Sequence, residues 1–105
     1  IYYRALGSEA FVTVGNGNLS SNTSYLFEIV RSGVSVSFYK NGTQVSTTQT
    51  LGANTALTVN QLLAISGVVV ANNLQAAEIF AYDSALSTSD RQAMEAYVNT
   101  RFAFF

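Results

Sequence analysis

Apolar and polar residues alternate from position 34 to position 39 of the chain, and Lys40 follows. Val34, Val36 and Phe38 occupy every second position, Ser35 and Ser37 stand between them, and Tyr39 follows. Successive side chains of a β-strand point to opposite faces, so a period of two predicts a strand with one buried face. We therefore expect a half-buried strand over residues 34–40.

The dipeptide Asn41-Gly42 follows this strand directly. Both residues tolerate the positive φ angles that a two-residue type I′ turn requires, so the pair predicts a tight β-hairpin. A two-residue loop also fixes the register of the two strands. The expected cross-strand pairs are Lys40 with Thr43, Phe38 with Val45, and Ser37 with Ser46.

Other segments rich in β-branched and aromatic residues predict further strands. Residues 25–31 are apolar on both faces except at Glu28 and the closing Arg31, a pattern typical of a strand that is covered on both sides in the middle of a sheet. The remaining expected strands cover residues 1–6, 10–14, 57–66 and 76–82.

A single helix is expected after the last of these strands. Ser87 stands at the N-cap position, and Asp90 occupies the capping-box position three residues later. Apolar residues then recur every three or four positions, which predicts one stripe that docks on the sheet. The stripe consists of Ala93, Met94, Tyr97, Val98 and Phe102. We expect the apolar chain end, residues 102–105, to be buried or to contact a partner.

The composition narrows the class of protein. Charged residues make up 10% of the chain, against about 25% in an average soluble protein. Neutral Ser, Thr and Asn must therefore supply the polar surface, which leads us to expect an all-β protein located outside the cell or on a virion surface.

The charge pattern and the missing residue types exclude several functions. A net charge of −1 with scattered basic residues argues against nucleic-acid binding. No apolar run reaches the ~18 residues of a membrane span, so no membrane insertion is expected. Without Cys or His, the chain cannot build a disulfide framework, a zinc finger or a Ser–His–Asp triad.

Three segments in order resemble the laminin G-like domains of the concanavalin A-like lectin and glucanase superfamily. The hairpin at residues 38–42 is similar to the family's aliphatic-Tyr-x-Asn-Gly motif. Residues 77–83, and then residues 84–102, resemble the family's last strand and its closing helix. The resemblance covers residues 25–102. It implies an all-β fold, namely an antiparallel β-sandwich (jelly roll) with a short C-terminal helix.

The resemblance also implies that the opening strands of such a sandwich are missing. Sandwiches of this kind interleave early and late strands, so a truncated copy would expose apolar sheet surface and strand edges. We expect residues 1–105 to form a single, N-terminally incomplete domain. Further N-terminal strands or a neighbouring subunit would complete it.

The hairpin at Asn41-Gly42 offers candidate residues for sugar binding. Aromatic rings stack on pyranose faces, while hydroxyls and amides hydrogen-bond to sugar hydroxyls. The candidates on the hairpin are Tyr39, Ser35, Ser37 and Gln44, and the further candidates are Tyr2, Tyr3, Ser46, Asn16, Asn18 and Asn22. The competing interpretation is that all of them are ordinary solvent-facing residues.

The acidic residues offer no catalytic pattern. Glycosidases need two carboxyl groups at a set separation, whereas the acids here are scattered along the chain at Glu9, Glu28, Glu78, Asp83, Asp90 and Glu95. We therefore predict no enzymatic activity. In the family the acid matching Glu78 is structural, and a buried hydrogen-bonding role is expected for it. Structural roles are also expected for Asn41, Gly42, Ser87 and Asp90.

Asp83 has two interpretations. Its carboxylate could join backbone carbonyls and the amides of Asn72 and Asn73 around a calcium ion, as in some related domains. The preferred interpretation is an Asx-type turn that orders the path into the helix. We expect no cofactor, with Ca²⁺ as the one alternative.

Three functions are compatible with these features. The first is a non-catalytic recognition or adhesion module of a larger extracellular or virion-surface protein, which binds a glycan or host-surface receptor. The second is a purely structural domain of a phage tail fibre, capsid decoration or surface appendage. The third is an accessory domain of a secreted glycoside hydrolase whose active site lies elsewhere.

Overall fold

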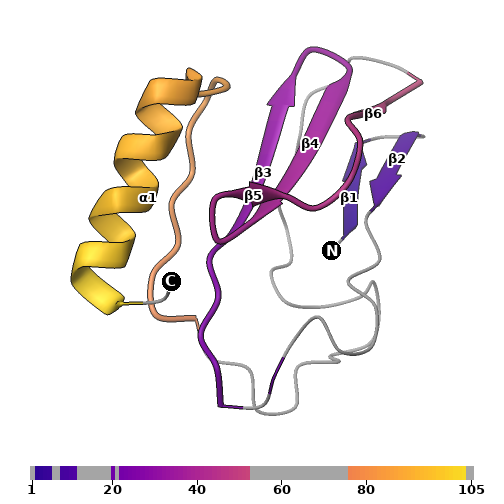
Figure 1. The fold of residues 1–105 in the computed structure, drawn as a ribbon. Helices are drawn as coiled ribbons and strands as arrows, with labels where there is room; N and C mark the ends of the chain where they lie inside the picture. Colours follow the sequence, from indigo (N-terminus) through magenta and orange to yellow (C-terminus); the bar gives the residue numbers. More distant parts are fainter. Residues whose placement is uncertain (1, 6–7, 12–19, 21, 53–75, 104–105) are drawn as a thin grey trace.

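The computed structural model describes residues 2–5, 8–11, 20, 22–52 and 76–103. These residues form six strands and one helix (Figure 1). The elements are β1 (Tyr2–Ala5), β2 (Ser8–Phe11), β3 (Phe27–Ser32), β4 (Ser35–Lys40), β5 (Thr43–Gln44), β6 (Gln49–Thr50) and α1 (Thr88–Phe102). The prediction of a strand at residues 57–66 lies outside the described residues.

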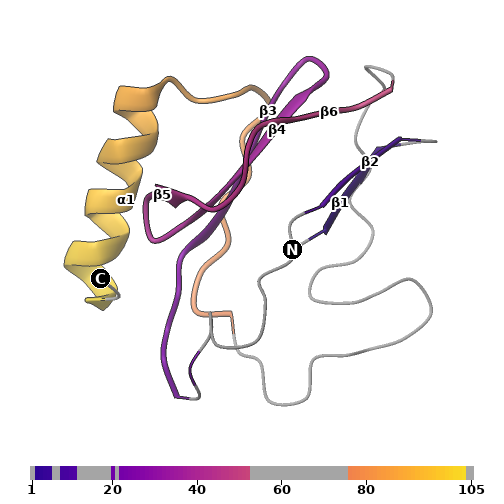
Figure 2. The same cartoon turned by 45° about the vertical axis from the view of Figure 1, so that its right-hand side comes forward.

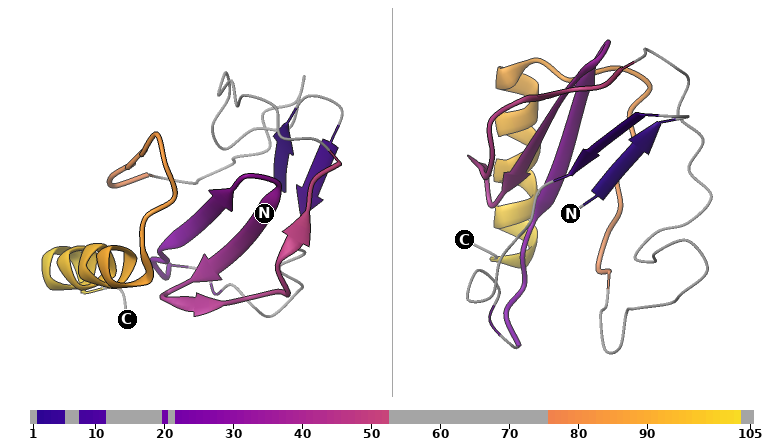
Figure 3. Two further views of the ribbon diagram at one scale, coloured as in Figure 1. Left: turned by 90° about the horizontal axis from the view of Figure 1, so that it is seen from above. Right: turned by 90° about the vertical axis from the view of Figure 1, so that its right-hand side faces the viewer.

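Strands β3 to β6 form one antiparallel sheet with β4 at its centre. Strand β3 pairs with one edge of β4 along its full length, while β5 and β6 pair with the other edge. Figures 2 and 3 show α1 on one side of this sheet and the antiparallel pair β1–β2 on the other, where β2 contacts β6. Within the described residues the fold is thus a four-stranded antiparallel sheet, a separate two-stranded ladder and one helix.

The turn between β4 and β5 confirms the predicted hairpin. Asn41 and Gly42 have φ angles of 50° and 74°, as a type I′ turn requires. Lys40 pairs with Thr43, and the backbone N–H of Val45 donates to the carbonyl of Phe38 over 3.0 Å. Local turn chemistry therefore sets the register at this end of the sheet.

The expected pairing of Ser37 with Ser46 is wrong, because β5 ends at Gln44 and the chain leaves the sheet. A continuous ladder would pair Val36 with Thr47, yet Val36 pairs with Gln49, two residues later. The amide of Gln44 donates to the carbonyl of Ser46 over 2.7 Å, which fixes the chain in this bulge. A two-residue bulge thus separates β5 from β6.

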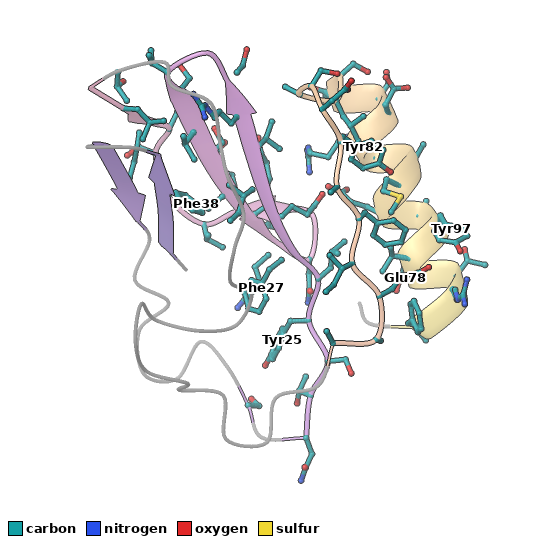
Figure 4. All side chains as sticks on the ribbon, turned by 180° about the vertical axis from the view of Figure 1, so that it is seen from behind. Tyr25, Phe27, Phe38, Glu78, Tyr82 and Tyr97 are labelled. Atoms are coloured by element: carbon teal, nitrogen blue, oxygen red, sulfur yellow. The ribbon has the colours of Figure 1, made fainter. Side chains whose placement is uncertain are left out.

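One face of the sheet carries the core, as the alternation predicted. Val36 and Phe38 are fully buried and Leu51 is nearly so. Figure 4 shows Phe38 on the side of the sheet away from the helix. Val34 was also expected on this buried face of the strand. It lies instead in the tight turn after Gly33, whose φ is 59°.

Strand β3 was expected in the middle of a sheet, but within the described residues it is an edge strand. Two of its apolar side chains, Phe27 and Ile29, keep 40% and 43% of their surface exposed. They lie on the same face as Phe38, which pairs with Ile29. The core face of the sheet is therefore only partly covered.

The predicted helix is confirmed, but the predicted stripe is buried only in part. Ala93 is exposed and Tyr97 is 45% exposed, whereas Val98 and Glu95 are buried. Arg91 and Glu95 lie one turn apart on α1, and Arg91 also faces Glu28 of the sheet. The docked face is consequently part apolar and part charged.

The expected last strand, residues 76–82, is wrong: this segment forms no strand in the structure. It runs beside α1 (Figure 1) and contacts the helix through side chains. The ring of Phe80 meets that of Tyr97 edge-on at 6.2 Å, and the hydroxyl of Tyr82 donates to the sulfur of Met94 over 3.4 Å. In the described part of the chain, no helix has the length and apolar character to cross a membrane.

Candidate functional site

Four predicted ligand-binding residues lie on one face of the sheet. Ser35, Ser37 and Tyr39 alternate along β4, and Gln44 of β5 pairs directly with Tyr39. We call this set the polar face. The hydroxyls of Ser37 and Thr48 are 2.8 Å apart, and the amide of Gln44 donates to Thr48 over 3.4 Å.

The other sugar-binding candidates do not extend the polar face. Asn22 is exposed in a turn with a φ of 56°, and Ser46 donates to the carbonyl of its neighbour Thr47. Tyr2 and Tyr3 belong to β1, whose side chains lie outside the described residues together with Asn16 and Asn18.

Helix α1 covers the Tyr39 end of the polar face. The guanidinium carbon of Arg91 lies 4.0 Å from the centre of the Tyr39 ring, a cation–π contact. One face of this ring is therefore occupied by the protein itself. Ser35 and Gln44, in contrast, are exposed.

Beneath the helix, Arg91 is shared by two carboxyl groups. Its guanidinium bonds to Glu95 Oε1 and lies 3.8 Å from Glu28 Oε1. The side chains of Arg91, Glu28 and Glu95 are only 11%, 14% and 12% exposed. We call these three residues the carboxyl cluster.

Glu28 is the member of the carboxyl cluster whose charge is least compensated. Its Oε1 is buried and has no hydrogen-bond partner. Burial, followed by repulsion from Glu95, raises the pKa of Glu28 to about 7, although the charge of Arg91 opposes the rise. The protonated form of this carboxyl group is thus favoured at weakly acidic pH.

The hairpin turn touches the same cluster. A Cβ atom added at Gly42 would lie 2.9 Å from Glu95 Oε2 and would displace that carboxylate, and the φ angle of 74° also favours glycine here. Asn41 accepts a hydrogen bond from the N–H of Leu26 through Oδ1, and its own N–H donates to the carbonyl of Leu26. The structural roles expected for Asn41 and Gly42 agree with these contacts.

The N-terminus of α1 is capped as the sequence indicated. Ser87 Oγ accepts a hydrogen bond from the N–H of Asp90 over 3.1 Å. The Ser87 hydroxyl also lies 2.6 Å from Asp90 Oδ2, to which it donates. This arrangement satisfies one of the free amides of the first turn.

Glu78 differs from the expectation of a buried side chain. Glu78 is not buried; its Oε1 lies 3.7 Å from Arg101 and joins the 76–82 segment to the end of α1 (Figure 4). Asp83 is exposed and accepts a hydrogen bond from the hydroxyl of Ser84. Among the described residues, no group of three or more Asp, Glu, His or Cys side chains could hold a metal ion.

The carboxyl cluster is the feature that the sequence interpretation missed. The acids are scattered along the sequence, but the fold brings Glu28 and Glu95 together at Arg91. A signal did exist: Glu28 is the one acid in an otherwise apolar segment, and Arg91 and Glu95 stand four residues apart on the helix. Their common location depended on how the helix docks.

Comparisons of the chain with family models, with curated proteins and with solved structures found no significant match in any of the three.

Proposed function

We propose that the chain is a non-catalytic recognition or adhesion module, part of a larger extracellular or virion-surface protein, that binds glycans through the polar face. The observation that supports this most is the grouping of Ser35, Ser37, Tyr39 and Gln44 on one face of the β4–β5 hairpin. The proposal includes a laminin G-like sandwich as the scaffold.

The chemistry of the polar face suits a neutral sugar. Ser37 and Thr48 present paired hydroxyls, and Gln44 adds an amide, so donors and acceptors alternate over a short distance. No charged side chain belongs to this set, which favours a neutral saccharide over an acidic one. Arg91 already covers one face of Tyr39, so a sugar would meet the edge of that ring.

The carboxyl cluster supports a non-catalytic role. Glycosidase carboxyls flank the scissile bond of a substrate and must reach it. Glu28 and Glu95 instead lie between helix and sheet, nearly buried, and share a single arginine. Their arrangement serves the contact between α1 and β3.

A glycan array tests this function, followed by titration calorimetry with each sugar that binds. We expect Gln44→Ala to weaken binding about 2- to 10-fold, because one lost hydrogen bond costs about 0.5–1.5 kcal/mol. Ser84→Ala, an exposed serine outside the polar face, is the matched control. Absence of binding to every sugar, or equal binding by both variants, would contradict the proposal.

A second candidate is a purely structural domain of a fibre, capsid or surface appendage. Among the described residues it is favoured by five large apolar side chains that stay at least 40% exposed, namely Phe27, Ile29, Ile79, Tyr82 and Tyr97. Exposed apolar surface of this kind marks subunit contacts. Analytical ultracentrifugation separates the two: concentration-dependent assembly that Ile29→Ser abolishes, without sugar binding, would favour the structural role.

A further inference from the structure

Helix α1 is held against the sheet by an unbalanced set of charges. Two carboxyl groups, Glu28 on β3 and Glu95 on α1, face one guanidinium, that of Arg91. If both acids are ionised, one negative charge has no counter-charge in a contact that is nearly closed to water. Such a charge is costly to bury.

The buried oxygen that has no hydrogen-bond partner is Glu28 Oε1. The groups that face the Glu28 carboxyl are Arg91 and Glu95 from α1, the ring of Tyr39 from β4, and the backbone of Gly42 from the hairpin turn. A proton on Glu28 would remove the excess charge and let the carboxyl donate a hydrogen bond to Glu95.

We propose that Glu28 and Glu95 share one proton as a latch that holds α1 on the sheet, and that loss of this proton loosens the helix and uncovers the ring of Tyr39. The proton moves to solvent, and no other bond is made or broken. The pKa of Glu28, raised to about 7, supports a transition close to neutral pH. The latch does not depend on glycan binding, although it would control access to the Tyr39 end of the polar face.

The proposal is tested by hydrogen exchange of the intact chain at pH 5.5 and 8.5, expressed as protection factors so that the intrinsic pH dependence of exchange is removed. We expect the amides of α1 to lose about 10- to 100-fold of their protection at the higher pH, since each pKa unit corresponds to a factor of ten. At pH 8.5 they should also be less protected than the amides of β4, which open only with the sheet.

Two variants separate the latch from a general effect of pH. Glu28→Gln places a neutral hydrogen-bond donor at this position at every pH. Glu95→Gln removes the second acidic charge, so that Arg91 balances Glu28 alone. Each variant should therefore keep α1 protected at both pH values. Glu78→Gln, which alters the acid beside Arg101 at the far end of α1, should retain the wild-type pH dependence.

Three results would contradict the proposal. Protection of α1 that does not change with pH would overturn the proposal, and so would equal protection of α1 and β4, since the helix would then open only by global unfolding. A pH dependence that survives in both cluster variants would overturn it as well.

Discussion

The central guanidinium carbon of Arg91 lies 4.0 Å from the centre of the Tyr39 ring. Tyr39 pairs across the sheet with Glu28, so the helix contacts two neighbouring strands through one side chain. The same guanidinium bonds to Glu95 on its own helix. Arg91 is therefore the residue that joins α1 to the sheet.

We expect Arg91→Ala to lower the free energy of unfolding by about 2–4 kcal/mol, because it leaves two facing carboxyl groups without their shared cation. Chemical denaturation followed by circular dichroism measures this change. Arg101→Ala is the matched control, since that side chain is 56% exposed and its contact with Glu78 is 3.7 Å long. A loss no larger for Arg91→Ala than for Arg101→Ala would contradict the role given to Arg91.

The N-cap of α1 gives a second prediction. Ser87→Ala removes the acceptor for the N–H of Asp90 and should cost about 1 kcal/mol of stability. Ser84→Ala, whose hydroxyl donates only locally to Asp83, should leave the stability nearly unchanged. Ser87→Asp should restore most of the loss, because aspartate is an equally good cap; if it did not, the cap would not be the cause.

Features set by local chemistry were predictable from the sequence. The Asn41-Gly42 turn depends on two φ angles, the core face of β4 on a period of two, and the start of α1 on one hydroxyl at Ser87. Each signal lies within a few residues of the structure it determines. The turn and the cap were confirmed, and the core face was confirmed at Val36 and Phe38 but not at Val34.

Features set by distant contacts were not predictable. The apolar stripe placed Ala93 and Tyr97 against the sheet, but the helix turns Arg91 and Glu95 inward because Glu28 lies there. Residues 76–82 have the composition of a strand, yet a strand also needs a partner edge, and this segment contacts α1 through side chains instead. Neither outcome is encoded in a local pattern.

The two glycines with positive φ in the described strand turns provide a matched comparison. Gly33→Ala meets no atom within 4 Å and should cost only the conformational penalty of about 1–2 kcal/mol. Gly42→Ala has the same conformational penalty and also displaces the carboxylate of Glu95. We therefore expect it to be less stable than Gly33→Ala by about 1 kcal/mol or more. Adding Glu95→Ala to each variant should remove this difference, and a difference that persisted would contradict the close approach.

The carboxyl cluster predicts how stability depends on pH. The pKa of Glu28 is about 7 in the folded chain, above its ordinary value of 4.5, so between these values the folded state binds more protons than the unfolded state. The free energy of unfolding should therefore be highest below pH 4.5 as far as Glu28 is concerned, fall as the pH rises to about 7, and level off above that. After allowance for solvent screening, the fall should amount to about 1–2 kcal/mol. Urea denaturation at pH 5 and pH 8 measures it, and Glu28→Gln should flatten the profile; stability that rose over this interval in the wild type would show that Glu28 is ionised in the folded chain.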